Sequence, residues 1–220
     1  IAIIAAMMLA SIYLVKKRLY VLGRISKFTM PFLEIALFIT VILSVKDMNF
    51  TNIKPVLYHN TKPVISNTLL IFTLPFGESV ICMPLFAGVE HNEKILPIFL
   101  KGALFGFINL ILANLRNIFV LGYSSSIYDF PSYESVSVIS IGEFFTRIEV
   151  FIGINLLLAG FIKICVSLYS SCFFLSKAFG FEDYAKLSAP CGLIIILLSI
   201  IAHNNTVEMF SLVKFYPYYC

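Results

Sequence analysis

The stretch TLLIFTLPFGESVICMPLF, residues 68–86, decides the fold, because two helix-breaking residues lie in the middle of an apolar run. The run is long enough to cross a bilayer, whose hydrocarbon core of about 30 Å needs roughly 20 apolar residues in a helix. Pro75 removes a backbone hydrogen bond and crowds the preceding turn, and Gly77 permits torsions that other residues resist. The pattern predicts a membrane helix broken at residues 74–78. In lipid, such backbone persists only where protein or a wet cavity satisfies its freed polar groups.

The composition of the chain indicates a multispanning, all-α integral membrane protein. Of its 220 residues, 60% are hydrophobic and 13% are charged, and the mean hydropathy is +0.95. This leaves too little polar surface to cover a water-soluble globule. The net charge of +4 comes from short Lys and Arg clusters between apolar runs. Such clusters are typical of segments that flank a lipid bilayer, so we expect no nucleic-acid partner.

Six apolar segments are predicted membrane spans, and we expect them to form a single membrane domain over residues 1–220. They are residues 1–15, 28–45, 67–89, 95–121, 150–175 and 189–202. The chain opens inside an apolar run at Ile1 and stops at Cys220 as an aromatic segment begins. We therefore expect a chain that is truncated at both ends.

The loops between the spans predict the orientation of the chain. Five basic residues follow the first span within residues 16–27, whereas residues 122–142 contain no Lys or Arg. Cytoplasmic loops carry an excess of Lys and Arg. The first loop is therefore expected in the cytoplasm and residues 122–142 on the outer side. Arg116 lies near the outer end of its span, where we expect its long side chain to reach water.

Glu78 and Lys163 are charged residues inside predicted spans. An ionisable residue there usually faces the bundle interior, where a carboxylate binds a proton, a cation or an amino group. The alternative for Glu78 is a simple proline kink, with the carboxylate paired to a neighbouring helix or reaching the interface. Lys163 needs a carboxylate, carbonyl groups or water, and Glu78 is a candidate partner.

Four residues at the start of the fifth span or within it lie near one helical face: Glu149, Gly153, Gly160 and Lys163. The two glycines would let a second helix approach closely. This face is either a packing seam or part of a site.

The chain contains no recognisable catalytic, phosphate-binding or metal-ligand motif. Its histidines lie in loops or at span ends, and its five cysteines form no CxxC pair and have no histidine at ligand spacing. We therefore predict no enzyme activity, no metal and no cofactor, and we expect the cysteines to be packed free thiols.

Three motifs resemble the permease-like B subunit of spore germinant receptors. They are Gly23-Arg24, LPFGE at residues 74–78 and, the most specific, FPSYESVSVISIGEFFTRIE at residues 130–149. The resemblance continues through residues 160–169 and 179–187, so it covers nearly the whole chain. This family resembles amino acid/polyamine/organocation transporters. That implies a LeuT-like 5+5 inverted-repeat fold of ten helices, in which the first and sixth helices are broken around a midplane ligand site.

The chain would then supply about helices 4 to 9 of 10, with residues 67–89 as the sixth. Residues 122–142 become the external loop between helices seven and eight, which in this fold can act as a lid. The direction of helix four in such a fold agrees with the orientation that the charges predict.

The resemblance implies a nutrient-sensing subunit in the inner membrane of a spore, working with a larger A subunit and a lipid-anchored C subunit. The ligand would be a small nutrient such as an amino acid. Its expected contacts are Leu74, Pro75, Phe76, Gly77 and Glu78, with Asn155, Ala159 and Gly160 on the opposite wall. Glu78 and Lys163 would form a charge pair that stands in for a coupling ion. The alternatives are a proton-coupled amino acid permease, with Glu78 as proton carrier, and a scaffold whose ligand site has decayed.

Overall fold

The structure is a computed structural model that describes residues 2–54, 64, 67–69, 72–87, 94–138, 149–202 and 208. These residues are largely helical and include no strand, which confirms the predicted all-α class. Several predicted features lie outside the described residues. They are residues 139–148 of the block at 130–149, Cys220, and the side chains of Leu74, Pro75 and Glu149.

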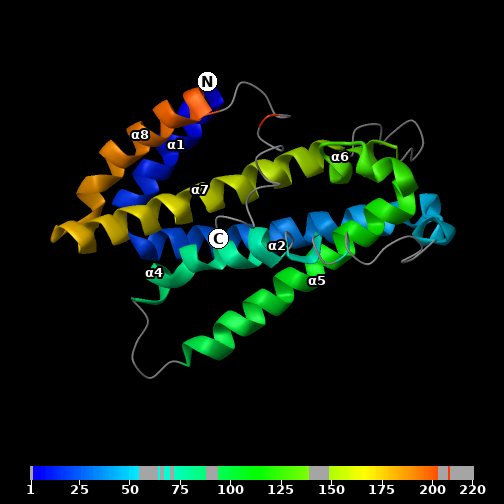
Figure 1. The fold of residues 1–220 in the computed structure, drawn as a ribbon, viewed down its shortest axis with the longest axis horizontal. Helices are drawn as coiled ribbons and strands as arrows, with labels where there is room; N and C mark the ends of the chain where they lie inside the picture. Colours follow the sequence, from blue (N-terminus) through cyan, green and yellow to red (C-terminus); the bar gives the residue numbers. More distant parts are fainter. Residues whose placement is uncertain are drawn as a thin grey trace. The chain divides into compact units, whose positions relative to one another are not determined.

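Six helices carry most of the chain (Figure 1): α1 (Ala2–Lys16), α2 (Leu19–Ser44), α5 (Ile95–Leu121), α6 (Pro131–Ser137), α7 (Glu149–Phe179) and α8 (Ser188–Ala202). Shorter helical turns are η1 (Val45–Asp47), η2 (Phe50–Ile53), η3 (Phe72–Phe76), η4 (Gly77–Cys82), α4 (Met83–Phe86), η5 (Gly122–Ser126) and η6 (Tyr184–Leu187).

Four helical stretches are long and apolar enough to cross a membrane: Leu19–Asp47, Ile95–Ser126, Val150–Phe179 and Tyr184–Ala202. They confirm the prediction of a multi-pass membrane protein. Two shorter apolar helices, Ala2–Lys16 and Gly77–Phe86, lie in the predicted spans 1–15 and 67–89.

Helix α2 begins at Leu19, whereas the predicted apolar span begins at residue 28. The helix continues through Arg24 and Lys27 because Arg and Lys are good helix formers, and their long stems let the charges reach polar surroundings. Before α2, Arg18 has a left-handed backbone with a φ of 73°. This residue separates α1 from α2 in a tight turn.

The chain divides into two compact units. Unit 1 contains Ile1–Ser26, His59–Glu93 and Phe161–Cys220, and unit 2 contains Lys27–Tyr58 and Lys94–Gly160. Helices α2 and α7 each contribute one end to each unit.

In unit 1, α1 and α8 lie side by side (Figure 1). Their core also includes the C-terminal part of α7, and its buried members include Met8, Ile12, Val15, Cys165, Leu168 and Cys172. Gly192 of α8 allows this close contact: a Cβ atom added there would lie 2.5 Å from Ile12 Cδ1. Cys82, Cys165, Cys172 and Cys191 are free thiols.

The glycine that allows close packing differs from those that the sequence indicates. A Cβ atom at Gly153 or Gly160 would meet nothing within 4 Å in the structure. Among the described glycines, the shortest approach to a neighbouring helix is instead at Gly192. The reason is that the spacing of small residues identifies a face of a helix but not which helix covers it.

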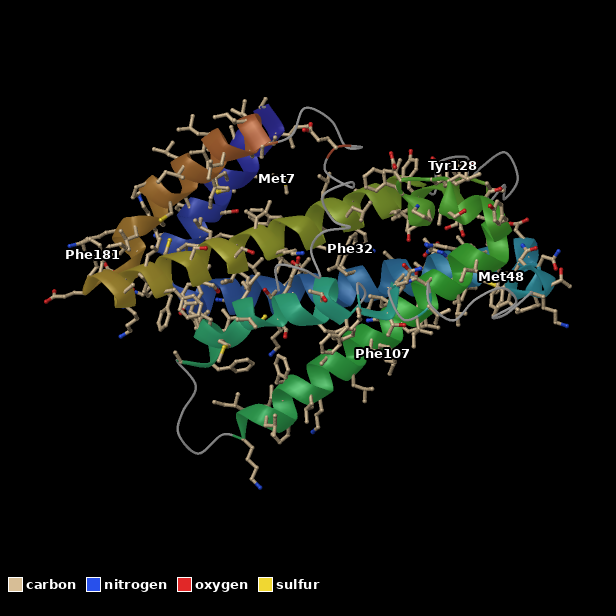
Figure 2. The ribbon with its side chains drawn as sticks, viewed as in Figure 1. Met7, Phe32, Met48, Phe107, Tyr128 and Phe181 are labelled. Atoms are coloured by element: carbon tan, nitrogen blue, oxygen red, sulfur yellow. The ribbon has the colours of Figure 1, made fainter. Side chains whose placement is uncertain are left out.

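In unit 2, α5 contacts α6, η2 and η5. The Asn52 side chain donates to the Phe119 carbonyl at 3.0 Å and so attaches η2 to the end of α5. Figure 2 shows Met48 and Tyr128 toward this end of the unit, and Phe107 near the middle of α5. Helix α6 buries Val136, which packs with Ile152 of α7.

Candidate functional site

The segment predicted to break stays helical but leaves the α-helix. Phe72–Phe76 forms a π-helical turn, Gly77–Cys82 a 3₁₀-helix, and α4 resumes α-helical geometry at Met83. The helix type thus changes from π to 3₁₀ at the Phe76–Gly77 peptide bond. Such changes are frequent at hinges and functional sites.

Helix α7 completes the hydrogen bonding of η4. In a 3₁₀ turn the Ile81 carbonyl would accept a bond from residue 84, but Pro84 has no N–H. The buried hydroxyl of Ser170 donates to this carbonyl instead. A side chain of α7 therefore supplies the donor that the proline removes.

The charged residue of the segment is paired with α7 as well. Lys163 Nζ forms an ion pair with Glu78 Oε2, and the exposed fraction of the side chain is 20% for Glu78 and 62% for Lys163. Among the described residues other than Glu208, no other acidic and basic side chains lie within the 4.0 Å limit of an ion pair. Both residues belong to unit 1. The two charges of the pair balance each other.

Two of the three residues predicted on the opposite wall line a cavity in unit 2. The cavity has a volume of about 280 Å³. Asn155 and Ala159 are on its wall, whereas Gly160 is not. The wall consists of Leu33, Glu34, Leu37, Asn109, Ala113, Arg116, Ser132, Ile152, Asn155, Leu156 and Ala159. The structure thus brings Asn155 together with Ala159 in unit 2, and Glu78 together with Lys163 in unit 1.

Arg116 does not reach water, contrary to the expectation from its place in the span. Its exposed fraction is 1%. The guanidinium donates to Thr40 Oγ1 at 2.8 Å, to Asn117 Oδ1 at 2.9 and 3.3 Å, and to the Ser132 carbonyl at 3.3 Å. These partners come from α2, α5 and α6, so the buried cation joins three helices. They hold the cation inside because each supplies an oxygen that replaces water.

Glu34 also lines this cavity, and the motifs and charges considered in the sequence did not point to it. Its Oε1 accepts a bond from Asn109 Nδ2 at 2.7 Å, whereas Oε2 is buried and has no hydrogen-bond partner among the described residues. The Asn155 amide donates to the Leu33 carbonyl at 3.2 Å, and its buried Oδ1 likewise has no partner in the part of the chain that the structure describes. The signal for Glu34 was present in the sequence, because a carboxylate inside a predicted span is costly and usually functional.

Residues 1–207 match the family described as "Spore germination protein". The chain belongs to this family of spore germination proteins. It is 28% identical over 211 residues to Spore germination protein KB of Bacillus subtilis (strain 168), an alignment that covers 93% of this chain and 56% of that relative. This spore germination protein therefore spans little more than half the length of the curated relative. No solved structure shows significant similarity to it.

Membership of the family confirms the resemblance carried by the LPFGE and FPSYESV motifs. The spore germination protein has helices that suit a multi-pass membrane protein, and its family agrees with the predicted location in the spore inner membrane.

Proposed function

We propose that this spore germination protein is the membrane subunit of a germinant receptor and senses a small nutrient such as an amino acid. The observation that carries the proposal is the ion pair between Glu78, in a helical segment that departs from α-geometry, and Lys163 of α7. Charged residues and irregular helix inside a membrane are features of ligand and ion sites. Membership of the spore germination family supports germination as the process.

The proposed fold is LeuT-like, with this chain as about helices 4 to 9 of 10. In that arrangement residues 67–89 form the broken sixth helix and α7 the eighth. Amides and carbonyls at Leu74–Gly77 would hold the charged groups of the ligand. The change of helix type at Gly77 supports this assignment, because a backbone that leaves the α-helix has polar groups to offer.

The Glu78–Lys163 pair is proposed to take the place of a coupling ion. A transporter that uses an ion binds and releases it in every cycle, whereas a covalently attached cation cannot leave. The ligand would then favour one packing of the helices over another, and this difference in affinity is what partner subunits can detect. The proposed partners are an A subunit and a C subunit of the receptor.

The test is Glu78→Gln, which keeps the size of the side chain and removes its charge. Lys163 is left without its counter-charge, so we expect the nutrient concentration for half-maximal germination to shift by about tenfold, equivalent to roughly 1.4 kcal/mol. The measurement is a germination dose response in spores that carry the variant. Glu182→Gln, at an exposed position after α7, is the matched control and should respond as wild type. An unchanged dose response from a normally assembled Glu78→Gln receptor would contradict the proposal.

Two alternatives make different predictions for the same segment. A proton-coupled amino acid permease requires Glu78 to gain and lose a proton, so its ion pair with Lys163 must break in each cycle. A scaffold with a decayed site requires that substitutions at residues 74–78 change abundance without changing which nutrient is sensed.

A further inference from the structure

A second cavity of unit 2 lies where the chain passes from α5 into α6. Its volume is about 600 Å³. The described part of its wall consists of Ile127, Tyr128, Asp129, Phe130, Tyr133, Glu134 and Leu156. All of these except Leu156, a residue of α7, belong to residues 127–134, and Figure 2 shows Tyr128 near α6. The wall therefore combines three aromatic rings with two carboxylates, and its described residues include no basic side chain.

The aromatic side chains of this wall are accessible from the surface of the unit. The exposed fraction is 38% for Tyr133, 43% for Tyr128 and 50% for Phe130. The face of an aromatic ring attracts a cation, and aromatic residues are enriched where proteins contact each other. These rings are thus open to a group that enters the cavity from outside the chain.

The two carboxylates of the wall add negative charge beside the rings. Asp129 is exposed and Glu134 is partly buried, and neither forms an ion pair with a described residue. Residues 122–138 contain no Lys or Arg that could balance them. Carboxylates and ring faces both favour a cation. A zwitterionic amino acid fits poorly, because its own carboxylate would meet two like charges.

Helix α6 holds this wall in place from its opposite face. Asn117 of α5 donates to Ser132 Oγ at 3.0 Å and accepts from the buried Ser135 hydroxyl at 2.9 Å. Tyr133 and Glu134, which line the cavity, lie between these two serines in the sequence. A preformed wall lowers the ordering cost of binding.

We propose that this cavity is a docking site for a lysine or arginine side chain that a partner protein presents, with its cation at the aromatic rings and at Asp129 and Glu134. A protein suits the site better than a small cation does, because sites for small ligands enclose most of the ligand, whereas these rings lie open. Contiguous exposed apolar side chains with a polar rim mark surfaces that another protein covers. The inference goes beyond nutrient sensing and rests on the proposed function only in requiring partner subunits.

The first experiment identifies what enters the cavity. A photoreactive benzophenone amino acid replaces Tyr128 in the natural full-length protein, which is irradiated in membranes that contain its partner subunits. The control position is Tyr123, which is exposed and does not line the cavity. We expect crosslinks to a Lys- or Arg-containing peptide of a partner subunit, at least fivefold stronger from residue 128 than from residue 123. Equal yields, no crosslink, crosslinks to lipid alone, or a peptide without Lys and Arg would overturn the proposal.

The second experiment reverses the charge of the site. Asp129→Lys places a cation in the cavity, so the amount of partner that co-purifies with the full-length protein should fall at least tenfold. Asp47→Lys is the matched control, because Asp47 is also exposed and in unit 2 but does not line the cavity. Changing the crosslinked basic residue of the partner to Glu should restore association with Asp129→Lys. A merely structural defect of this variant would not be rescued by a change in the partner.

The outcomes separate this inference from the proposed function. If the receptor senses its nutrient while Asp129→Lys retains its partner, the docking assignment is wrong and the sensing function stands. If the charge exchange restores association while Glu78→Gln leaves the dose response unchanged, the docking site stands and the sensing proposal fails. Should Asp129→Lys not accumulate in the membrane, the crosslink from residue 128 in the otherwise unchanged protein decides.

Discussion

Around Arg116, a single buried charge organises the polar residues of three helices. Asn117 is central to this arrangement: its Oδ1 accepts bonds from Arg116 and from Ser135, each at 2.9 Å, and its Nδ2 donates to Ser132 Oγ at 3.0 Å. The network keeps α6 against α5 through residues of the loop expected to act as a lid. A polar group buried in this way costs free energy once its partner is removed.

Asn117→Leu should therefore destabilise the protein by about 1–3 kcal/mol, because Arg116 loses an acceptor and two serines lose a partner. The matched control is Asn114→Leu, since Asn114 is exposed and its amide donates to the Leu110 carbonyl of its own helix. The measurement is the fraction of full-length protein that remains monodisperse in detergent after heating. Equal thermal stability of the two variants would contradict a structural role for the network.

At this scale, the sequence shows that Arg116 is charged but not which residues it bonds to. The burial of Arg116 depends on Thr40, which is 76 positions away in the chain. Position along a span estimates depth in the bilayer, and depth alone places Arg116 near water. The oxygens that keep it inside come from helices whose contacts no spacing rule reveals.

Among the elements, the contact between α1 and α8 depends on the absence of a side chain at Gly192. A Cβ atom there would lie 2.5 Å from Ile12 Cδ1 and 2.7 Å from its Cγ1. Ile12 is itself buried in the core of unit 1, so it has little space into which it can move.

Gly192→Ala should destabilise unit 1 by about 1–3 kcal/mol, because overpacking forces side chains or helices apart. Gly106→Ala is the matched control: nothing lies within 4 Å of its added Cβ, and alanine favours the helix. The reaction of a thiol dye on heating reports the opening of the core, since Cys165 and Cys172 are fully buried. The assignment of this contact would be wrong if both variants exposed their thiols at the same temperature.

For the elements, hydropathy and breaker residues were informative because both act locally. The apolar segments became helices, and the departure from α-geometry occurs around Pro75 and Gly77. The first residues of α2 were not predicted as part of the span. Hydropathy identifies only the part of a helix that lies in the lipid, whereas the backbone hydrogen bonds of α2 begin at Leu19. The hydrogen bond from the Ser170 hydroxyl to the Ile81 carbonyl could not be predicted either, because its two residues are 89 positions apart in the chain.

At the scale of the whole molecule, the membrane class and the family could be predicted from the sequence, because composition and the LPFGE and FPSYESV motifs are read directly along the chain. The site is less accessible to such reasoning. Glu78 and Lys163 could be proposed as partners by charge, but the cavity of Glu34 and Arg116 arises only when α2, α5, α6 and α7 are placed together.

The central claim is that this protein binds a nutrient without carrying it across the membrane. The most direct test compares saturable binding of radiolabelled amino acids with their uptake into sealed vesicles, using the full-length protein with its A and C subunits. The account predicts binding without uptake. It also predicts that Glu78→Gln shifts the nutrient concentration for half-maximal germination. Saturable uptake that Glu78→Gln abolishes would contradict it, because the segment around Gly77 would then be the moving part of a working permease.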